Sequence, residues 1–229
     1  VIYTPTANAD SVAEMTVGLF LALERRIVEA HAKCLRSEFT TIAPKDFLGT
    51  EIMGKTFGQI GMGNIAQRIG HILSAGFGMT LLGYDPFIST EEAAKRGFRK
   101  VDTLEELLEQ SDLVNINVPL VKSTENMISG KLFDHFKPGA VFVNAARGAV
   151  INEDGLYGAL VSGKLKAAAC DTFVNEPPTA ENKLLSLPNF IATPHLGGNT
   201  EESLRKAGTE VVEETLNVLA GKPPAHPVI

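Results

Sequence analysis

Short apolar runs alternate with longer amphipathic segments along most of this chain. The apolar runs cover residues 57–60, 79–84, 113–117, 140–144, 166–170 and 190–192. They are rich in Val, Ile, Phe and Ala and show little of the alternation that marks a strand with one solvated face. Continuous apolar runs of this kind are typical of strands that helices cover on both sides. The pattern therefore predicts a parallel sheet.

The segments between these runs place their apolar residues at helical spacing. They predict helices at about 64–75, 90–97, 103–110, 129–135, 152–162 and 200–219. A longer helix is expected to begin at Ser11-Val12-Ala13-Glu14, which fits a capping box, and to continue to about Leu35. A loop over residues 39–54 connects this helix with the first expected strand.

Strands that alternate with helices are typical of an α/β protein. The expected fold class is a doubly wound parallel sheet of the Rossmann type. The sequence contains no internal repeat, low-complexity tract or coiled-coil heptad, which argues against solenoid and filament architectures. Doubly wound sheets bind ligands outside the carboxyl ends of their strands, so functional residues are expected there.

The composition of the 229-residue chain is that of a globular protein, with 44% hydrophobic and 21% charged residues. A net charge of −6 and the lack of a basic stripe with interleaved aromatic residues argue against nucleic-acid binding. The apolar run at 17–23 is too short to span a bilayer and no signal peptide is visible, so no membrane association is expected. We expect a cytoplasmic protein in which Cys34 and Cys170, which lack metal-binding spacing, are reduced apolar filler.

A glycine-rich turn, Gly61-Met62-Gly63-Asn64-Ile65, follows the first expected strand and opens the next helix. Gly61 permits a tight turn, and Gly63 has no side chain to keep a pyrophosphate from the backbone N–H groups at the helix N-terminus. Ala66 stands where a third Gly is common, and Ala is tolerated because this residue only has to let helix and strand approach closely. The turn is therefore expected to bind a dinucleotide.

Asp85 follows the second apolar run and lies 19 residues after Ala66. This is close to the spacing of about 20 residues at which an acidic residue binds the adenosine ribose. Pro86 and Phe87 come next, so a 2′-phosphate would meet negative charge and no basic partner. NAD is therefore expected rather than NADP. The alternative is an ordinary strand-to-helix turn followed by a surface Asp.

Small and polar residues follow the later strands, at the edge where ligands bind. Those expected to contact cofactor or substrate are Val118, Pro119, Ala145, Ala146, Arg147, Asp171, Glu176, His195 and Gly197. A cofactor that carries hydride needs a partner that carries a proton, and His is suited to this near neutral pH. The other histidines, expected to be structural or surface residues, are His31, His71, His135 and His226.

Three side chains on this edge have complementary chemistry. His195 would move a proton, and Glu176 would orient its ring and stabilise its charge. Arg147 would hold a carboxylate or carbonyl oxygen with its planar fork of donors. The alternatives are a loop histidine with satisfied hydrogen bonds, a solvated acid ahead of Pro177-Pro178, and an arginine in a structural ion pair.

Together these motifs resemble those of the D-isomer-specific 2-hydroxyacid dehydrogenases, and in particular the phosphoglycerate dehydrogenase-like members. The similar segments are the glycine turn with Asp85, Asn144-Ala145-Ala146-Arg147-Gly148, Asp171-Thr172-Phe173-Val174-Asn175-Glu176-Pro177-Pro178 and Thr193-Pro194-His195-Leu196-Gly197-Gly198. The opening segment 4–14 also looks like the start of that family's cofactor domain. The resemblance extends over essentially the whole chain.

The resemblance implies a role for each motif. Arg147 would bind the substrate carboxylate and carbonyl, and His195, paired with Glu176, would be the acid/base. Asp171 would hold the nicotinamide carboxamide and Asp85 the adenosine ribose hydroxyls, with the glycine turn at the pyrophosphate. The implied reaction is hydride transfer between NAD and a 2-hydroxy or 2-keto acid. Phosphoglycerate, glycerate/hydroxypyruvate and the substrates of phosphite-oxidising relatives all stay open.

The resemblance also implies how the chain is divided. Residues 1–10 would be an interdomain linker, residues 11–222 the dinucleotide-binding domain, and residues 223–229 the start of a return to a second, smaller substrate domain. That second domain is expected to be largely missing, so the chain would bind NADH but turn over poorly by itself. The alternative function is a non-catalytic NAD(H)-sensing scaffold, like the transcriptional corepressors that share this fold.

Self-association is a further expectation. The first helix carries more apolar residues than one buried face requires. These residues are Met15, Val17, Leu19, Phe20, Leu21 and Leu23. The resembled family also pairs its subunits through the cofactor domain. We therefore expect a homodimer, with a small-molecule 2-hydroxy acid as the other partner.

Overall fold

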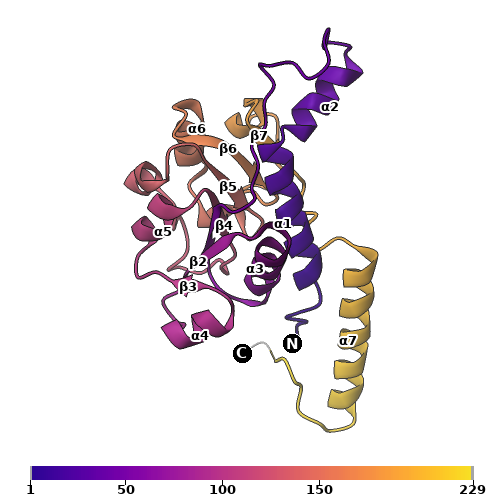
Figure 1. The fold of residues 1–229 in the computed structure, drawn as a ribbon. Helices are drawn as coiled ribbons and strands as arrows, with labels where there is room; N and C mark the ends of the chain where they lie inside the picture. The colour runs from indigo at the N-terminus through magenta and orange to yellow at the C-terminus, as the bar shows by residue number, and fades with distance from the viewer. Residues whose placement is uncertain (1, 228–229) are drawn as a thin grey trace.

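The computed structural model describes residues 2–227, and within them one parallel sheet lies between two layers of helices (Figure 1). Its strands are β1 (Thr56–Ile60), β2 (Thr80–Tyr84), β3 (Arg99–Lys100), β4 (Leu113–Ile116), β5 (Ala140–Asn144), β6 (Leu165–Cys170) and β7 (Phe190–Ala192). They lie in the order β3-β2-β1-β4-β5-β6-β7, and all neighbours are parallel. The strand order reverses between β1 and β4, where doubly wound sheets bind ligands. The predicted fold class is confirmed.

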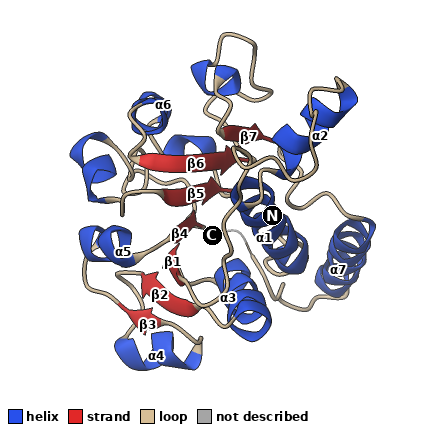
Figure 2. Cartoon of the chain, turned by 45° about the horizontal axis from the view of Figure 1, so that its top comes forward, coloured by secondary structure: helices blue, strands red, loops and turns tan. Residues whose placement is uncertain are grey.

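Helices cover both faces of the sheet (Figure 2). The helices are α1 (Ala9–Glu24), α2 (Ile27–Leu35), α3 (Asn64–Phe77), α4 (Thr90–Lys95), α5 (Leu104–Gln110), α6 (Glu153–Val161) and α7 (Glu201–Leu219). Short 3-10 helices are η1 (Gly130–His135), η2 (Gly148–Val150) and η3 (Lys183–Ser186). Helices α1 and α3 pack on one face, and α5, α6 and η1 pack on the other. Helices α2 and α7 lie at the periphery (Figure 1).

The core is formed by two apolar layers, one on each face of the sheet. Phe20 of α1 packs edge-on against Phe57 of β1, with ring centroids 5.9 Å apart. On the other face, Phe136 packs against Phe142 of β5 in the same manner at 5.7 Å. Every residue of β4 and β5 is buried. Burial on both faces explains why these strands read as continuous apolar runs.

The expected helix from residue 11 to 35 is wrong because the structure divides it into two. Helix α1 ends before Arg25, and Arg26 adopts a left-handed backbone conformation with a φ of 52°. The Arg26 guanidinium pairs with Glu29 at 2.9 Å and lies 3.7 Å above the centre of the Phe47 ring. These contacts fix α2 in a direction different from that of α1.

The start of α1 also contradicts the expected capping box. The helix begins at Ala9 after Asn8, and Ser11 is buried in its first turn. The Ser11 hydroxyl lies 2.7 Å from the hydroxyl of Thr200, the residue before α7. Ser11 therefore links two helices that are distant in sequence and does not cap its own.

Most of the apolar residues of α1 that suggested self-association are buried inside the subunit. Val17, Leu19, Phe20 and Leu23 are at most 7% exposed and pack in the layer between α1 and the sheet. Met15 and Leu21, which were part of the same argument, are only partly buried. The expected homodimer stays a prediction.

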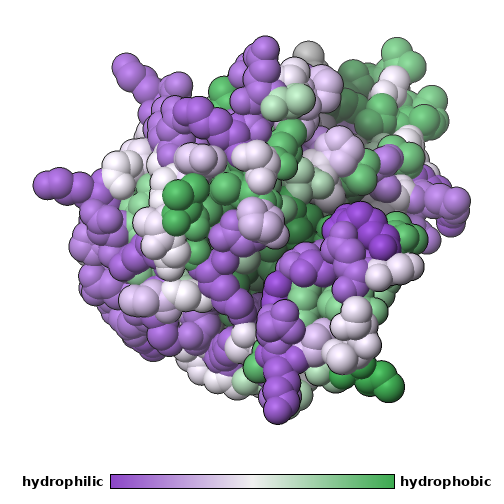
Figure 3. Space-filling view, turned by 90° about the horizontal axis from the view of Figure 1, so that it is seen from above, coloured by the Kyte–Doolittle hydropathy of each residue, from purple (hydrophilic) through white to green (hydrophobic). Residues whose placement is uncertain are grey.

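Apolar side chains are instead exposed at the end of the molecule that carries α2. None of the described residues 27–35 is buried, and Val28 and Leu35 are 51% and 74% exposed. Leu48, in the loop that follows α2, is 76% exposed. Figure 3 views the molecule from this end and shows apolar surface among hydrophilic residues.

Three smaller expectations differ from the structure. The strand β3 was missed because it has only two residues, and the helix expected at 129–135 is the 3-10 helix η1. Cys34 is exposed, so it is not apolar filler. Cys170 on β6 is buried as expected, and this burial raises the pKa of its thiol.

The first and last described segments of the chain lie side by side (Figure 1). Ile2 and Pro227 form an antiparallel bridge, and the Tyr3 N–H donates to the His226 carbonyl at 3.2 Å. The division into a linker at 1–10, a domain at 11–222 and a return segment at 223–229 remains a prediction, of which residues 1, 228 and 229 lie outside the described part. Within residues 2–227, no helix has both the length and the apolar character needed to cross a membrane.

Candidate active site

The two glycines of the turn between β1 and α3 meet different constraints. Gly61 has a φ of +80°, and a Cβ there would lie 2.6 Å from the Asn117 carbonyl oxygen, so the position requires Gly. A Cβ at Gly63 would meet nothing within 4 Å. The space beside Gly63 lies at the N-terminus of α3, where the amides of Asn64 and Ile65 have no acceptor within residues 2–227.

This turn fits the phosphates of a dinucleotide. Open space beside free amides, at the positive end of a helix dipole, favours an anion. Ala66 is fully buried, as the close approach of α3 to the sheet requires. Met62 is also fully buried and packs against Gly83 of β2, so only its backbone is available to a ligand.

Asp85 lies at the carboxyl end of β2, beside the glycine turn. Its Oδ2 accepts from the Met62 N–H at 3.1 Å, and its Oδ1 accepts from the Phe87 N–H at 3.0 Å. These two bonds hold the carboxylate next to the turn. Each carboxylate oxygen keeps a further lone pair, so Asp85 can still accept from ribose hydroxyls.

A cleft of about 450 Å³ runs from the start of α3 along the carboxyl ends of β4, β5 and β6. Most of the predicted strand-end residues line it. They are Val118, Pro119, Ala145, Ala146, Arg147, Asp171, His195 and Gly197, together with Ile65 of the glycine turn. The sequence thus predicted one continuous wall, because parallel strands present their carboxyl ends at the same edge.

Other residues of the cleft were not predicted. They are Asn8, Val12, Asn117, Gly198 and Asn199. Asn117 directly follows β4, so its position at a strand end was a usable signal. Asn8 and Val12 reach the cleft only because the start of α1 packs over the sheet, and no local pattern indicates this contact.

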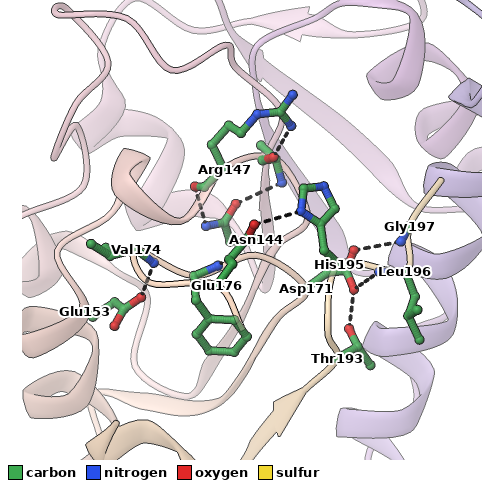
Figure 4. A network of polar contacts seen from close by, with 12 residues as sticks. Asn144, Arg147, Glu153, Asp171, Val174, Glu176, Thr193, His195, Leu196 and Gly197 are labelled. Carbon is green, nitrogen blue, oxygen red and sulfur yellow. Dashed lines mark hydrogen bonds and ion pairs between the residues drawn. The ribbon is translucent and has the colours of Figure 1, made fainter. Parts of the chain in front are cut away.

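Asp171 is the structural centre of the loop that carries His195 (Figure 4). It is 1% exposed and follows β6 directly. The carboxylate accepts from the Leu196 and Gly197 amides, both at 2.8 Å, and from the Thr193 hydroxyl at 2.5 Å. The Asp171 carbonyl accepts from the His195 N–H at 2.7 Å. Asp171 therefore fixes the backbone on both sides of the histidine.

The His195 ring pairs with Glu176. The ring Nδ1 lies 3.0 Å from the Glu176 Oε2, and the other carboxylate oxygen accepts from the Phe173 N–H at 3.0 Å. His195 itself has a φ of 59°, a left-handed conformation that is uncommon for a residue with a side chain. Glu176 does not line the main cleft but a neighbouring hollow of about 320 Å³, which His195 also lines. The ring therefore stands between its carboxylate partner and the cleft.

The carboxyl group of Glu176 is held in its charged form. Burial alone raises its pKa, but hydrogen bonds from the His195 ring and the Phe173 amide outweigh this effect, and the charge of Arg147 contributes in the same direction. The pKa of Glu176 consequently lies below its ordinary value. An ionised carboxylate at this place stabilises a positive charge on the imidazole.

Arg147 lies in the loop that follows β5 and lines the cleft. The Asn144 side chain shapes its loop, because Oδ1 accepts from the Ala146 N–H and Nδ2 donates to the Arg147 carbonyl, both at 3.0 Å. Gly148 packs directly on the backbone of Phe173 and leaves no room for a Cβ. The Arg147 loop and the Glu176 loop are thereby held together, and the guanidinium is exposed in the cleft wall.

The site therefore combines three chemical functions. The glycine turn and Asp85 fit a dinucleotide, His195 with Glu176 can exchange a proton, and the Arg147 guanidinium can bind a carboxylate. Within residues 2–227, His195 and Arg147 are the His and Arg side chains that line the cleft.

The family model described as "D-isomer specific 2-hydroxyacid dehydrogenase, NAD binding domain" matches residues 17–197. The chain is 44% identical over 222 residues to the D-3-phosphoglycerate dehydrogenase of Methanocaldococcus jannaschii, a match that covers 97% of this chain and 41% of the relative. It is 42% identical over 221 residues to the hydroxypyruvate reductase of Thermotoga maritima, covering 96% and 70% respectively. The chain thus spans less than half the length of the first of these relatives.

Solved structures share the fold. The crystal structure of D-lactate dehydrogenase with NAD+ from Lactobacillus jensenii superposes with a TM-score of 0.87 at 31% sequence identity. The superposition covers 100% of this chain and 71% of that chain. The TT0316 protein from Thermus thermophilus has a TM-score of 0.91 at 31% identity, with the same coverage.

Proposed function

Because this chain belongs to the D-isomer-specific 2-hydroxyacid dehydrogenases and contains their NAD-binding domain, we propose that it acts in hydride transfer between NAD and a small 2-hydroxy acid. The observation that carries the proposal is the His195–Glu176 pair, which stands at the cleft that Arg147 also lines. A site that only binds a nucleotide needs neither a histidine paired with a carboxylate nor an arginine in the cleft wall. Phosphoglycerate and glycerate/hydroxypyruvate are the substrates that the names of the relatives favour.

The glycine turn and Asp85 would hold the cofactor. The amides of Asn64 and Ile65 would bind the pyrophosphate, and the Asp85 carboxylate would accept from the adenosine ribose hydroxyls. Asp171 has both oxygens engaged by its own loop, so its carboxylate would act mainly by shaping the wall at the nicotinamide end. Bound NAD supplies the hydride acceptor, which this chain's side chains cannot provide.

The substrate end depends on Arg147 and His195. The Arg147 fork would bind the substrate carboxylate through two parallel hydrogen bonds and so orient C2. The His195 Nδ1 is occupied by Glu176, so Nε2 is the nitrogen that can take the proton from the C2 hydroxyl during oxidation and return it during reduction. The Glu176 carboxylate would stabilise the ring while it carries that proton.

The test has two steps. NADH binding to the 229-residue chain is measured by fluorescence titration. NAD reduction by the full-length native protein is then assayed with a panel of 2-hydroxy acids that includes D-3-phosphoglycerate and D-glycerate. Binding together with turnover of one panel member supports the proposal. Binding without turnover by the full-length protein supports the non-catalytic NAD(H)-sensing scaffold instead.

We also propose that two subunits associate through the end of the molecule that carries α2. Val28 and Leu35 are seven residues apart on α2 and so lie on one face of the helix, and both are more than half exposed. A helix that exposes apolar residues suits an isologous contact, in which α2 of a second copy covers α2 of the first.

A further inference from the structure

Three side-chain amides lie beneath the glycine turn. Gln59 on β1 and Asn115 on β4 are register partners, and both are fully buried. Asn117, just after β4, lines the cleft. Buried strands of a parallel sheet usually carry apolar side chains, so amides here need an explanation. We refer to Gln59, Asn115 and Asn117 as the amide triad.

Two backbone carbonyls determine which way round the triad lies. The Gln59 Nε2 donates to the Ile60 carbonyl at 3.0 Å and to the Gly61 carbonyl at 2.9 Å, and a carbonyl oxygen can only accept. The Gln59 Oε1 then accepts from the Asn115 Nδ2 at 2.9 Å. The Asn115 Nδ2 also donates to the Asn117 Oδ1. The Asn117 oxygen therefore faces the triad.

The Asn117 Nδ2 is left over by this arrangement. Within residues 2–227 it has no hydrogen-bond partner, although the atom is buried, and the same is true of the Asn115 Oδ1 on β4. Unpaired buried polar atoms are rare in folded proteins and are often found at functional sites. Both unpaired atoms belong to the triad, and Asn117 is the triad member in the cleft wall, so they lie at or directly behind the site.

The triad is also part of a wider frame around the turn. Four outside groups hold the backbone of Gly61 and Met62. They are the Gln59 Nε2 on the Gly61 carbonyl, the Tyr84 carbonyl on the Gly61 amide, the Asp85 Oδ2 on the Met62 amide, and the Arg96 Nη1 on the Met62 carbonyl. The backbone N–H and carbonyl groups of Gly61 and Met62 are therefore all hydrogen-bonded within the chain. The amides of Asn64 and Ile65 that follow stay free for a ligand.

We propose that the amide triad positions the nicotinamide nucleotide. Gln59 holds the glycine turn in the shape that receives the pyrophosphate, and Asn117 supports the cleft wall against which the nucleotide lies. Asn115 hydrogen-bonds to both of them and so couples the orientation of the Gln59 amide to that of the Asn117 amide. The inference rests on the proposed function, because it takes the nucleotide as the ligand. The triad residues are positioning residues and take no part in proton transfer.

The experiment measures the NADH dissociation constant of the 229-residue chain and of three variants by fluorescence titration. Gln59→Leu removes the hold on the turn and should weaken binding about tenfold, while Asn117→Ala removes the link between the triad and the cleft wall and should weaken it about fivefold. If both act through one network, the double variant loses clearly less than the product of the two single effects, about 50-fold.

Asn189→Leu is the matched control. Asn189 precedes β7 at the opposite end of the sheet, where its Nδ2 donates to the Lys166 carbonyl at 3.1 Å and to the Leu160 carbonyl at 3.5 Å. Losing these bonds should lower the unfolding temperature about as much as Gln59→Leu does. The NADH dissociation constant of the control should equal that of the wild type, which separates positioning from stability.

Several results would overturn the inference. A folded Gln59→Leu variant with wild-type NADH affinity shows that the triad does not position the nucleotide. If that variant does not fold, Asn117→Ala decides, because its strand-end position is only half buried. Unchanged affinity in Asn117→Ala then rejects the inference. A wild-type chain that binds no NADH rejects the proposed function as well, whereas wild-type binding with unaffected variants rejects the triad alone.

Discussion

The His195 Nδ1 lies 3.0 Å from the Glu176 Oε2, although the two residues belong to loops that follow different strands. The backbone of His195 is fixed by Asp171, and the Glu176 carboxylate is fixed by the Phe173 amide. Backbone groups of Asp171 and Phe173 therefore hold the two partners in place, in addition to the bond between the partners themselves. This arrangement leaves the Nε2 of the ring free toward the cleft.

Replacing His195 should remove most of the turnover in a preparation that oxidises a 2-hydroxy acid. A positioned acid/base contributes about 100-fold to 10,000-fold, so we expect His195→Ala to lower kcat by this order. NADH binding should change by less than about threefold, because the nucleotide is held mainly at the glycine turn. Steady-state kinetics and NADH titration test both parts. Wild-type turnover in the variant would leave only a nucleotide-binding fold.

Arg147→Lys should act mainly on substrate capture. An ammonium group keeps the charge but cannot form two parallel hydrogen bonds to a carboxylate, so KM should rise about tenfold or more. His135→Ala, at an exposed histidine that pairs with Glu109 far from the cleft, serves as a control for handling and folding. If KM stays constant and only kcat falls, Arg147 does not bind the substrate carboxylate.

The Glu176–His195 pair should make stability depend on pH in one direction. The pKa of Glu176 is lowered in the folded chain, since hydrogen bonds from His195 and Phe173 outweigh the opposing effect of burial. A lowered pKa adds stability above the ordinary carboxyl value of about 4.3, and this stability is lost as the pH falls through the folded value. The unfolding temperature of the wild type should therefore exceed that of Glu176→Gln at about pH 6, and the gap should close below about pH 4. A gap that widens on acidification contradicts this assignment.

The two glycines of the turn should respond differently to a side chain. Gly63→Val places methyl groups in open space at the phosphate site, so folding should persist while NADH binding weakens at least about tenfold. Gly61→Ala forces a side chain into a positive φ and against the Asn117 carbonyl, and should destabilise the fold by more than about 1 kcal/mol. Thermal unfolding and NADH titration of both variants separate the effects. Equal NADH affinity in Gly63→Val and the wild type would contradict a phosphate at this place.

Cofactor preference should depend on Asp85. Asp85→Ser with Pro86→Arg removes the ribose acceptor and supplies a partner for a 2′-phosphate, so the ratio of NAD to NADP affinity should fall at least about tenfold. The Asp85→Ser change also removes the carboxylate bond to the Met62 amide, so some weakening for both cofactors is expected. An unchanged ratio means that Asp85 does not face the ribose.

Placing charged side chains on the exposed face of α2 tests the proposed association through this helix. Val28→Glu with Leu35→Glu places two carboxylates on the exposed apolar face of α2 and should shift the chain from dimer to monomer in sedimentation at micromolar concentration. Val161→Glu, at a similarly exposed position on α6, is the control and should leave the assembly unchanged. A wild-type monomer, or a dimer that survives the double substitution, rules out this surface.

The functional positions that could be predicted share one property, which is that local sequence fixes them. Gly61 and Gly63 are recognisable because a tight turn and an open phosphate site each exclude a side chain. Arg147, Asp171 and His195 are recognisable because each follows an apolar strand, and the carboxyl ends of parallel strands meet at one edge. Their joint position in one cleft was therefore predictable without coordinates.

Other features depend on contacts between distant segments. The break at Arg26 is set by a left-handed residue and a stacking contact with Phe47, and neither interrupts the helical periodicity of residues 11–35. Ser11 reads as a helix cap, yet its hydroxyl meets that of Thr200. Asn8 reaches the cleft only through the packing of α1.

The sequence by itself determined the fold class, the glycine turn and the order of strand-end residues, because hydrophobic periodicity and turn chemistry act over a few neighbouring residues. The family followed from the resemblance of its ordered motifs. Only the tertiary structure decided which apolar residues of α1 are buried, which way round the Gln59 amide lies, and that the Ser11 hydroxyl meets that of Thr200. Such pairings join residues that are far apart along the chain. Burial and side-chain hydrogen bonds are properties of the packed molecule, so no local pattern can carry them.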